Sequence, residues 1–263
     1  TGQIAESSRV DNYPGIPGID GYSLGEKFRE HAESLGVEFT EAQVLSLGQK
    51  DGIWIIGCDE DITLESKAVI YATGCKNRPL GVPGEEKYYG RGLSFCAVCD
   101  GAFYKGKRVA VIGGGDTALD DAMYLSDICE KVYLVHRREF FRGSASTLEK
   151  LKQKENVEII VNVRVEEITG DKKIDGIILD NKTKLNISGL FAAVGMIPQT
   201  ELLKEFGVLD ESNYVKASED TKTTVNGLFA AGDVRTKQLR QVVTAAADGA
   251  NAIYSVMEYL RNI

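Results

Sequence analysis

The segment at 108–126 constrains the fold of this chain more than any other. An apolar run over 109–112 leads into Gly113-Gly114-Gly115, and a helix pattern begins at Asp116. Glycines at such a junction let the backbone approach a pyrophosphate, which the positive N-terminal end of the helix attracts. A second apolar run over 131–135 completes a βαβ unit and predicts a parallel sheet with a dinucleotide site. The residues expected to line this site are Gly113, Gly115, Asp116, Thr117 and Ala118.

A basic cluster follows the second strand of this unit and indicates which dinucleotide binds. An NAD site normally has an acidic residue at this point, which accepts hydrogen bonds from the ribose 2′-hydroxyl. Here the chain has His136, Arg137 and Arg138, followed by Arg142. Guanidinium groups bind phosphate through charge-assisted, often bidentate hydrogen bonds. We therefore expect NADPH, and a basic turn that is merely solvated is the alternative interpretation.

A C-x-x-C pair, Cys96 and Cys99, lies shortly before this unit. The two sulfurs are one tight turn apart, so they can cycle between a dithiol and a disulfide. A structural zinc site needs about four ligands, and His31 and His136 lie in unrelated contexts, so no metal site is expected. An incidental buried pair remains the other alternative. Asp100 could move the proton that thiol–disulfide exchange requires, or could be only a turn or cap residue.

Composition excludes several classes of protein. The net charge of −8 argues against a general nucleic-acid-binding protein, which usually carries a basic face. No apolar run approaches the ~18 residues of a membrane span, and the first residues do not resemble a signal peptide. Five cysteines are an odd number, which fits reduced thiols and one working pair better than a secreted disulfide scaffold. We therefore expect a cytoplasmic protein without membrane or nucleic-acid partners.

The order of the predicted elements indicates two α/β domains, one inserted into the other. A helix near 24–35 and strands near 37–47, 52–58, 61–64 and 68–72 come first, and a helix over 241–261 closes the chain. Neither end segment has a complete sheet of its own. We therefore expect one domain made of 1–81 and 214–263, with a second domain, 82–213, inserted at the Pro/Gly-rich stretch near 79–84. Both domains are expected to be three-layer, Rossmann-like nucleotide-binding folds.

Electron transfer from a nicotinamide to a disulfide normally requires an intermediate carrier, and flavin is the usual one. Near the end of the chain a predicted strand ends in Gly232-Asp233, where a carboxylate could bind ribityl hydroxyls. A simple turn is the alternative interpretation of this dipeptide.

Together these motifs resemble those of the bacterial-type, low-molecular-weight thioredoxin reductases, over essentially the whole chain. The matching segments are Gly2-Gln3, Asp11-Asn12-Tyr13-Pro14-Gly15, Ala72-Thr73-Gly74, Cys96-Ala97-Val98-Cys99-Asp100, Gly113-Gly114-Gly115-Asp116-Thr117-Ala118, His136-Arg137-Arg138 with Arg142, and Gly232-Asp233-Val234 with Arg240-Gln241-Val242. The position of the Cys pair inside the nucleotide domain distinguishes this family from the lipoamide and glutathione reductases.

The resemblance implies a homodimer with FAD in the split domain and NADPH in the inserted one. NADPH would reduce FAD, FAD would reduce the Cys96–Cys99 disulfide, and the dithiol would reduce thioredoxin or a thioredoxin-like protein. In that scheme Cys99 faces the flavin, Cys96 attacks the substrate disulfide, and Asp100 is the acid. The residues that would line FAD are Gln3, Asn12, Thr73, Gly74, Gly232, Asp233, Arg240, Gln241 and Val242.

One feature of the family has no counterpart in this sequence. The family begins with a strand and its own G-x-G-x-x-G for the FAD pyrophosphate, about 40 residues before the segment that matches Gly2-Gln3. We therefore expect the sequence to be an incomplete record of its protein. If it is complete, the alternative is an NADPH-binding module without catalysis. A related reductase with another disulfide partner or another electron donor is the remaining alternative.

Overall fold

The structure is a computed structural model that describes residues 2–7 and 9–263. The chain forms two compact units, and the second is inserted into the first. The first contains residues 2–5, Tyr13–Lys76 and Met196–Ile263, and the second contains the described part of 6–12 and Asn77–Gly195. No helix in the described part of the chain has the length and apolar character needed to cross a bilayer.

The second unit carries the βαβ segment. Its elements are η2 (Glu85–Tyr88), β6 (Leu93–Ser94), α2 (Ala97–Asp100), η3 (Gly101–Tyr104), β7 (Arg108–Gly113), α3 (Asp116–Ser126), β8 (Lys131–His136), α4 (Ala145–Lys152), β9 (Val157–Val161), β10 (Val165–Thr169), β11 (Gly176–Leu179), β12 (Lys184–Asn186) and β13 (Gly189–Ala193). Five of these strands form a parallel sheet in the order β6-β13-β7-β8-β9, and β10, β11 and β12 form an antiparallel sheet.

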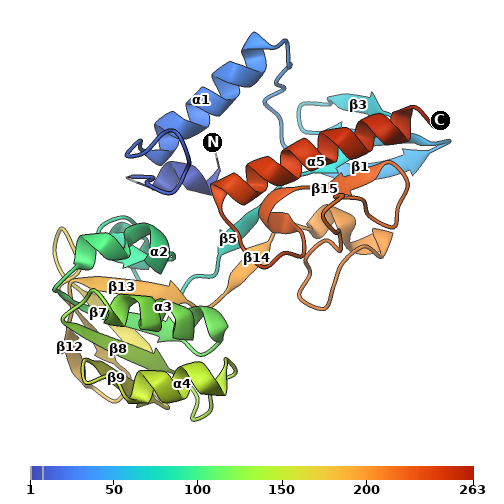
Figure 1. Cartoon of the computed structure of the whole chain (residues 1–263). Helices are drawn as coiled ribbons and strands as arrows, with labels where there is room; N and C mark the ends of the chain where they lie inside the picture. Colours follow the sequence, from blue (N-terminus) through green and yellow to red (C-terminus); the bar gives the residue numbers. More distant parts are fainter. Residues whose placement is uncertain (1, 8) are drawn as a thin grey trace. The chain divides into compact units, whose positions relative to one another are not determined.

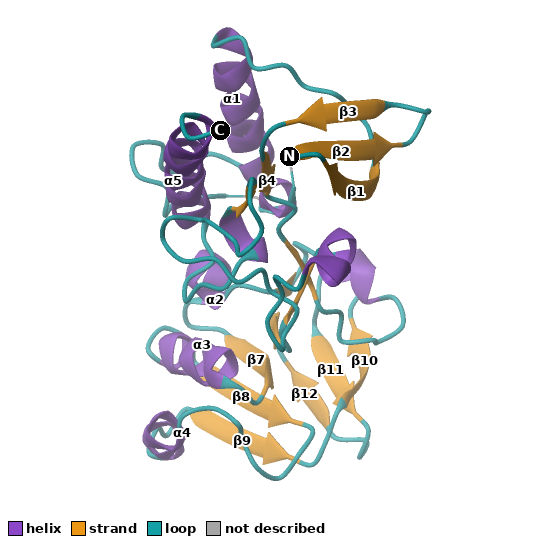
Figure 2. Ribbon diagram, turned by 90° about the vertical axis from the view of Figure 1, so that its right-hand side faces the viewer, coloured by secondary structure: helices purple, strands orange, loops and turns teal. Residues whose placement is uncertain are grey.

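The parallel sheet of the second unit is covered on both faces, which explains why β7 is apolar from Val109 to Ile112. Helices α3 and α4 lie on one face (Figure 1), and the antiparallel sheet lies on the other (Figure 2). Val109 and Val111 of β7 pack into the helix-side core, and Ala110 between them packs into the core on the opposite side. The alternation of side chains along a strand sends neighbours to opposite faces, so a strand between two layers needs apolar residues at every position. The three-layer, Rossmann-like prediction is confirmed here.

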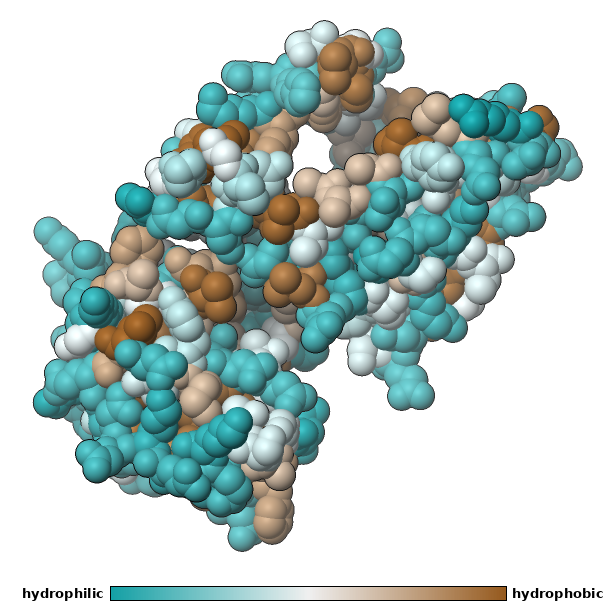
Figure 3. Space-filling model, viewed as in Figure 1, coloured by the Kyte–Doolittle hydropathy of each residue, from teal (hydrophilic) through white to brown (hydrophobic). Residues whose placement is uncertain are grey.

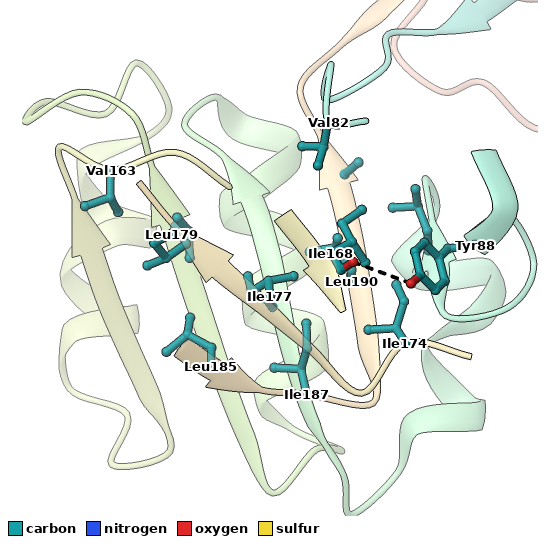
Figure 4. Packing of buried hydrophobic residues seen from close by; sticks show 14 residues of the cluster. Val82, Tyr88, Val163, Ile168, Ile174, Ile177, Leu179, Leu185, Ile187 and Leu190 are labelled. Atoms are coloured by element: carbon teal, nitrogen blue, oxygen red, sulfur yellow. Dashed lines mark hydrogen bonds between the residues drawn. The ribbon is translucent and has the colours of Figure 1, made fainter. Parts of the chain in front are cut away.

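Aliphatic side chains fill the space between the two sheets of this unit (Figure 4). Ile177 and Leu179 of β11 and Leu190 of β13 are completely buried in this core. Tyr88 closes one end of the core, where its hydroxyl donates to the carbonyl of Ile168 at 3.4 Å. Strand β7 packs on this core through Ala110 and leads into the glycine turn, Gly113-Gly114-Gly115, which is also called the dinucleotide turn after its predicted ligand.

The first unit contains fewer parallel strands. Its elements are η1 (Gln3–Glu6), α1 (Gly21–Ser34), β1 (Val44–Lys50), β2 (Ile53–Cys58), β3 (Thr63–Ser66), β4 (Val69–Tyr71), β5 (Cys75–Asn77), β14 (Met196–Pro198), η4 (Glu201–Phe206), β15 (Leu228–Ala230), η5 (Gly232–Val234) and α5 (Val242–Leu260). Strands β4 and β15 form a parallel pair, β1, β2 and β3 form an antiparallel sheet, and β5 pairs with β14. Trp54 of β2 is fully buried and shares a core with Leu228 of β15.

The sequence suggested that the chain passes between the two units near 82 and 213. In the structure it passes between them at 76/77 and at 195/196. The Pro/Gly-rich stretch near 79–84 is ordered within the second unit, because Val82 is buried and the Glu85 carboxylate accepts from the backbone N–H groups of Leu80 and Val82. Residues 196–213 belong to the first unit, where Leu203 is fully buried in the core around Trp54. The predicted strand near 37–47 also begins later, at Val44.

Candidate active site

A disulfide joins Cys96 and Cys99 at the two ends of the first turn of α2. Cys96 is the N-cap residue of this helix, and its Sγ accepts a hydrogen bond from the backbone N–H of Cys99 at 3.2 Å. Ala97 anchors the turn because it is fully buried in the helix-side core, whereas Val98 is exposed. Both cysteines are half-buried, so the disulfide is partly accessible at the edge of the unit.

Asp100 lies one residue beyond the disulfide and is fixed by Ser94. The Ser94 hydroxyl donates to Asp100 Oδ2 at 2.6 Å. The same hydroxyl oxygen accepts from the backbone N–H of Cys96 at 3.1 Å. Asp100 therefore has one carboxylate oxygen engaged with a buried serine beside the reactive turn.

The disulfide turn and the glycine turn lie at the same edge of the parallel sheet. The disulfide turn follows the C-terminal end of β6, and the glycine turn follows the C-terminal end of β7, with only β13 between them. Neighbouring strands are about 4.8 Å apart, so Ser94 lies about 10 Å from Val111 across β13, and the glycine turn begins two residues later along β7. Ala97 and Ala118 belong to the same core cluster, which connects the two turns. The C-terminal edge of a parallel sheet is where α/β proteins bind their ligands.

Each glycine of the dinucleotide turn meets a different environment. A Cβ on Gly113 would lie 2.4 Å from the carbonyl oxygen of Ala193, and one on Gly114 would lie 2.2 Å from the His136 ring. A Cβ on Gly115 would meet no protein atom within 4 Å. The first two glycines are therefore required by packing, whereas Gly115 faces open space at the start of α3, as a pyrophosphate site requires.

The basic loop is attached directly to the glycine turn. The backbone N–H groups of Arg142 and Gly143 donate to the carbonyl of Gly114 at 2.7 and 3.2 Å. The N–H of Ser144 donates to Asp116 Oδ1 at 2.7 Å. These bonds bring together residues about 28 positions apart in sequence and keep the loop beside the start of α3.

The three arginines of this loop are exposed and available to an anion. Arg137, Arg138 and Arg142 form no ion pair with any residue in the described part of the chain. Thr117, at the start of α3, is also exposed.

His136 is placed differently from the arginines that follow it. Its ring is buried under Gly114 and packs against Phe141 with a centroid distance of 4.9 Å. Burial, together with the nearby arginines, lowers the pKa of His136, so the ring is neutral at physiological pH. Its direct contact with a nucleotide remains a prediction, and its position suits support of the glycine turn.

In the first unit, Thr73-Gly74 and Gly232-Asp233 follow neighbouring parallel strands. Tyr71 of β4 is paired with Ala230 of β15, so the two dipeptides emerge at the same edge. Thr73 Oγ1 donates to the carbonyl of Gln199 at 2.7 Å. Gly74 and Gly232 both have positive φ, 68° and 77°, which glycine adopts without strain.

A buried ionic cluster holds the Gly232-Asp233 turn against α5. Asp248 accepts from the backbone N–H of Gly232 at 2.9 Å, from Arg235 at 2.6 and 2.8 Å, and from Lys237 at 2.8 Å. Burial alone would raise the pKa of Asp248, but the hydrogen bonds from the two cations outweigh it and lower the pKa. Asp248 is therefore an ionised carboxylate beneath the turn.

The other residues predicted to line FAD lie near the Gly232-Asp233 turn or in the N-terminal segment. Arg240 Nε donates to the carbonyl of Asp233 at 3.2 Å, and Gln241 is the N-cap residue of α5, which begins at Val242. Gln3 lies in η1. Asn12 falls in the segment 6–12 that groups with the second unit, so its contact with a flavin remains a prediction.

Comparison with known proteins identifies the family of this fold. The family model for pyridine nucleotide-disulphide oxidoreductases matches residues 3–249. The chain belongs to this family.

Several thioredoxin reductases resemble the chain over almost its full length. The thioredoxin reductase of Helicobacter pylori is 40% identical, and the alignment covers 99% of this chain and 88% of that protein. The Bacillus subtilis enzyme is 36% identical and covered to 84%, with 100% of this chain aligned. The crystal structure of thioredoxin reductase from Streptococcus pyogenes superposes with a TM-score of 0.92 at 37% identity, with 100% of this chain and 87% of that chain covered. These relatives place the protein among the bacterial-type thioredoxin reductases.

Among the unpartnered polar atoms, Asp233 Oδ1 fits the flavin that a pyridine nucleotide-disulphide oxidoreductase would hold. Within residues 2–7 and 9–263, three buried side-chain atoms have no hydrogen-bond partner, namely Trp54 Nε1, His136 Nε2 and Asp233 Oδ1. Burial raises the pKa of Asp233, as expected for a carboxylate that awaits a donor. Two of the three atoms belong to residues predicted to bind NADPH or FAD.

Sequence patterns did not single out Ser94, Arg235 or Asp248, which the structure brings into contact with the disulfide turn or the Gly232-Asp233 turn. Their roles depend on contacts across 6 to 16 residues that no short motif encodes. For Ser94, the signal that the sequence offers is a serine two residues before the C-x-x-C. For Asp248, the signal is an isolated acid in the apolar C-terminal helix.

Proposed function

We propose that the protein is an NADPH-dependent disulfide reductase that reduces thioredoxin or a thioredoxin-like protein through Cys96 and Cys99. One observation carries this proposal. A C-x-x-C disulfide and a dinucleotide turn lie at the ends of strands in one parallel sheet, separated by a single strand. The names of the full-length relatives support the choice of thioredoxin as the substrate.

NADPH rather than NADH is the proposed donor because of the loop after β8. Arg137, Arg138 and Arg142 offer three exposed guanidinium groups beside the start of α3. A 2′-phosphate would neutralise these positive charges, whereas the ribose hydroxyls of NADH would leave them without a partner. Gly115 leaves room for the pyrophosphate.

FAD is the proposed carrier, held in the first unit. Asp233 Oδ1 would accept a hydrogen bond from a ribityl hydroxyl, and Thr73, Gly74 and Arg240 would line the same edge. When bound, FAD supplies a two-electron relay between nicotinamide and disulfide. The Asp248 cluster fixes the backbone of Gly232, so the Asp233 carboxylate is aimed before the cofactor arrives.

The chain's own residues account for the exchange with the protein substrate. After reduction, the Cys96 thiolate attacks one sulfur of the substrate disulfide, and a mixed disulfide forms. The second substrate sulfur leaves as a thiol after Asp100 donates to it the proton that Cys96 gave up when its thiolate formed. Cys99 then attacks Cys96 Sγ, which closes the Cys96–Cys99 disulfide and releases the first substrate sulfur, and this sulfur takes up the proton that Cys99 loses. The N–H of Cys99 points at Cys96 Sγ and would stabilise its thiolate.

We also propose that the protein is a cytoplasmic homodimer. Ile253, Tyr254 and Met257 of α5 are exposed to 55%, 75% and 49%, so the helix presents apolar side chains suited to a second copy. Hydrophobic patches interrupt a mostly hydrophilic surface, some of them over α5 (Figure 3). A working dithiol and three free cysteines suit a reducing compartment.

Replacement of Arg137 and Arg138 by Ala tests the donor. We expect the KM for NADPH to rise at least about 10- to 150-fold, which is the effect of losing a single charge-assisted hydrogen bond of ~1.5–3 kcal/mol, while the KM for NADH changes little. Arg91→Ala is the control, because Arg91 is exposed and precedes β6 at the opposite edge of the sheet. Equal losses with both nucleotides would refute the 2′-phosphate assignment.

The colour of the purified protein tests the flavin. A colourless protein would refute the flavin assignment.

A further inference from the structure

The contacts of Ser94 connect the two chemical groups of the disulfide turn. Ser94 is the last residue of β6 and is only 6% exposed. Its Oγ accepts from the Cys96 N–H at 3.1 Å and donates to Asp100 Oδ2 at 2.6 Å. A hydroxyl has one proton, so while that proton is given to Asp100 the oxygen is left to accept from Cys96. One buried side chain thus fixes both the backbone of the attacking cysteine and one oxygen of the acid.

We propose that Ser94 is a positioning residue for proton transfer in thiol–disulfide exchange. It holds Asp100 Oδ2, so that Oδ1 is left to carry the proton that the leaving sulfur receives. This inference rests on the proposed function of the cysteine pair. It adds a specific role for a residue that does not itself touch the reacting sulfurs.

The parallel sheet gives Ser94 the rigidity that this role needs. Ser94 pairs with Phe191 of β13, and the Phe191 side chain is 1% exposed in the helix-side core. Ala97 is anchored in the same core, one residue beyond Cys96. Ser94 and the disulfide turn are therefore supported by the same helix-side core. A general acid on a short turn needs such support to keep its position.

The acidity of the leaving thiol determines how strongly the exchange rate depends on proton transfer from Asp100. Cys96 Sγ forms a bond to one substrate sulfur as the substrate S–S bond breaks, and the other sulfur departs with the electron pair. An alkyl thiolate has a conjugate pKa near ~8.5 and is a poor leaving group unless it is protonated. An acidic aromatic thiolate leaves readily without a proton. A defect in proton delivery therefore slows exchange with alkyl disulfides and spares aromatic ones.

The experiment compares the two leaving groups in the flavin-loaded protein. Wild type and Ser94→Ala are reduced with dithiothreitol, desalted, and mixed with 2-hydroxyethyl disulfide or with 5,5′-dithiobis(2-nitrobenzoate). We expect Ser94→Ala to lower the rate constant for the alkyl disulfide about 10- to 100-fold, with the aromatic reaction within about twofold of wild type. No NADPH is present, so failure of NADPH-driven turnover would count against the proposed function and leave this comparison intact.

Four further variants separate positioning from a general packing role. Ser94→Thr keeps the hydroxyl and should restore the alkyl rate. Asp100→Asn combined with Ser94→Ala should be no slower than Asp100→Asn alone, because both changes remove the same proton transfer. Ser126→Ala is the matched control, since Ser126 is also 6% exposed and donates only to the carbonyl of Met123 in α3. This control should leave the ratio of the two rates unchanged.

Two results would overturn the inference. Equal slowing of both disulfides by Ser94→Ala would mean that the serine supports only the shape of the turn. Additive effects of Ser94→Ala and Asp100→Asn would mean that the two residues act independently.

Discussion

At the residue scale, the glycines of the dinucleotide turn show how one motif contains two different requirements. Gly113 and Gly114 have no room for a side chain, because a carbonyl oxygen and an imidazole ring occupy that space. Gly115 has room in the protein, so its lack of a side chain serves the ligand. The motif could be recognised from sequence, but the division of roles could not, because it depends on Ala193 and His136 from other strands.

Substitution by alanine should separate these requirements. Gly113→Ala should destabilise the protein by about 1–3 kcal/mol, because the new Cβ overlaps the backbone of β13. Gly115→Ala should leave the free energy of unfolding within about 0.5 kcal/mol of wild type and weaken NADP⁺ binding about tenfold or more. Urea unfolding and calorimetric titration measure the two effects. Undiminished NADP⁺ binding by Gly115→Ala would show that the pyrophosphate lies elsewhere.

His136 should give the stability of the protein a pH dependence. Its pKa is lowered by burial, so below about pH 6.5 the unfolded chain binds a proton that the folded chain does not. The contribution of His136 to the free energy of unfolding should therefore fall as the pH drops through that range and level off below the folded pKa, whereas Asp121, whose pKa burial raises to about 7, contributes in the opposite direction. His136→Gln should remove the His136 contribution, so the difference between the wild-type and His136→Gln curves should change across this range.

The second histidine is the control for this measurement. His31 is exposed on α1, and His31→Gln should retain the wild-type pH profile of unfolding. A profile that changes with His31→Gln and stays at wild type with His136→Gln would contradict the assignment.

At the scale of elements, long periodic segments could be predicted and short paired ones could not. The pattern located α3 at Asp116–Ser126 and placed β7, β8 and α5 within a residue or two, because each has enough residues to show its period. Strands β5, β6 and β14 have two or three residues and are defined only by partners far away in sequence. Strand β6 matters most, because it places the cysteine pair beside the dinucleotide turn.

The link between α5 and the Gly232-Asp233 turn is also invisible in sequence, and it should carry much of the stability of the first unit. Asp248→Ala leaves Arg235 and Lys237 buried without their carboxylate, and removal of one partner from such a cluster costs about 3–5 kcal/mol. Glu166→Ala, which breaks the exposed pair with Lys182, should cost less than about 1 kcal/mol. Chemical unfolding compares the two. Similar small losses would show that the buried cluster contributes little.

At the scale of the whole molecule, the inserted arrangement followed from the sequence, but the points of exchange did not. Proline and glycine near 79–84 indicated a linker, yet Glu85 organises this stretch by accepting from two backbone N–H groups. The candidate site was predictable where local motifs carry it, at the cysteine pair, the glycine turn and the arginines. The contributions of Ser94 and Asp248 require contacts that only the folded chain creates.

Anaerobic thiol labelling of the flavin-loaded protein tests the central claim most directly. One equivalent of NADPH should open the Cys96–Cys99 disulfide, so that both cysteines become alkylated, and oxidised thioredoxin added afterwards should close it again. Mass spectrometry of the labelled peptides reads both steps. A disulfide that stays closed with NADPH, or thioredoxin reduction that persists when Cys96 and Cys99 are both replaced by Ser, would contradict the account.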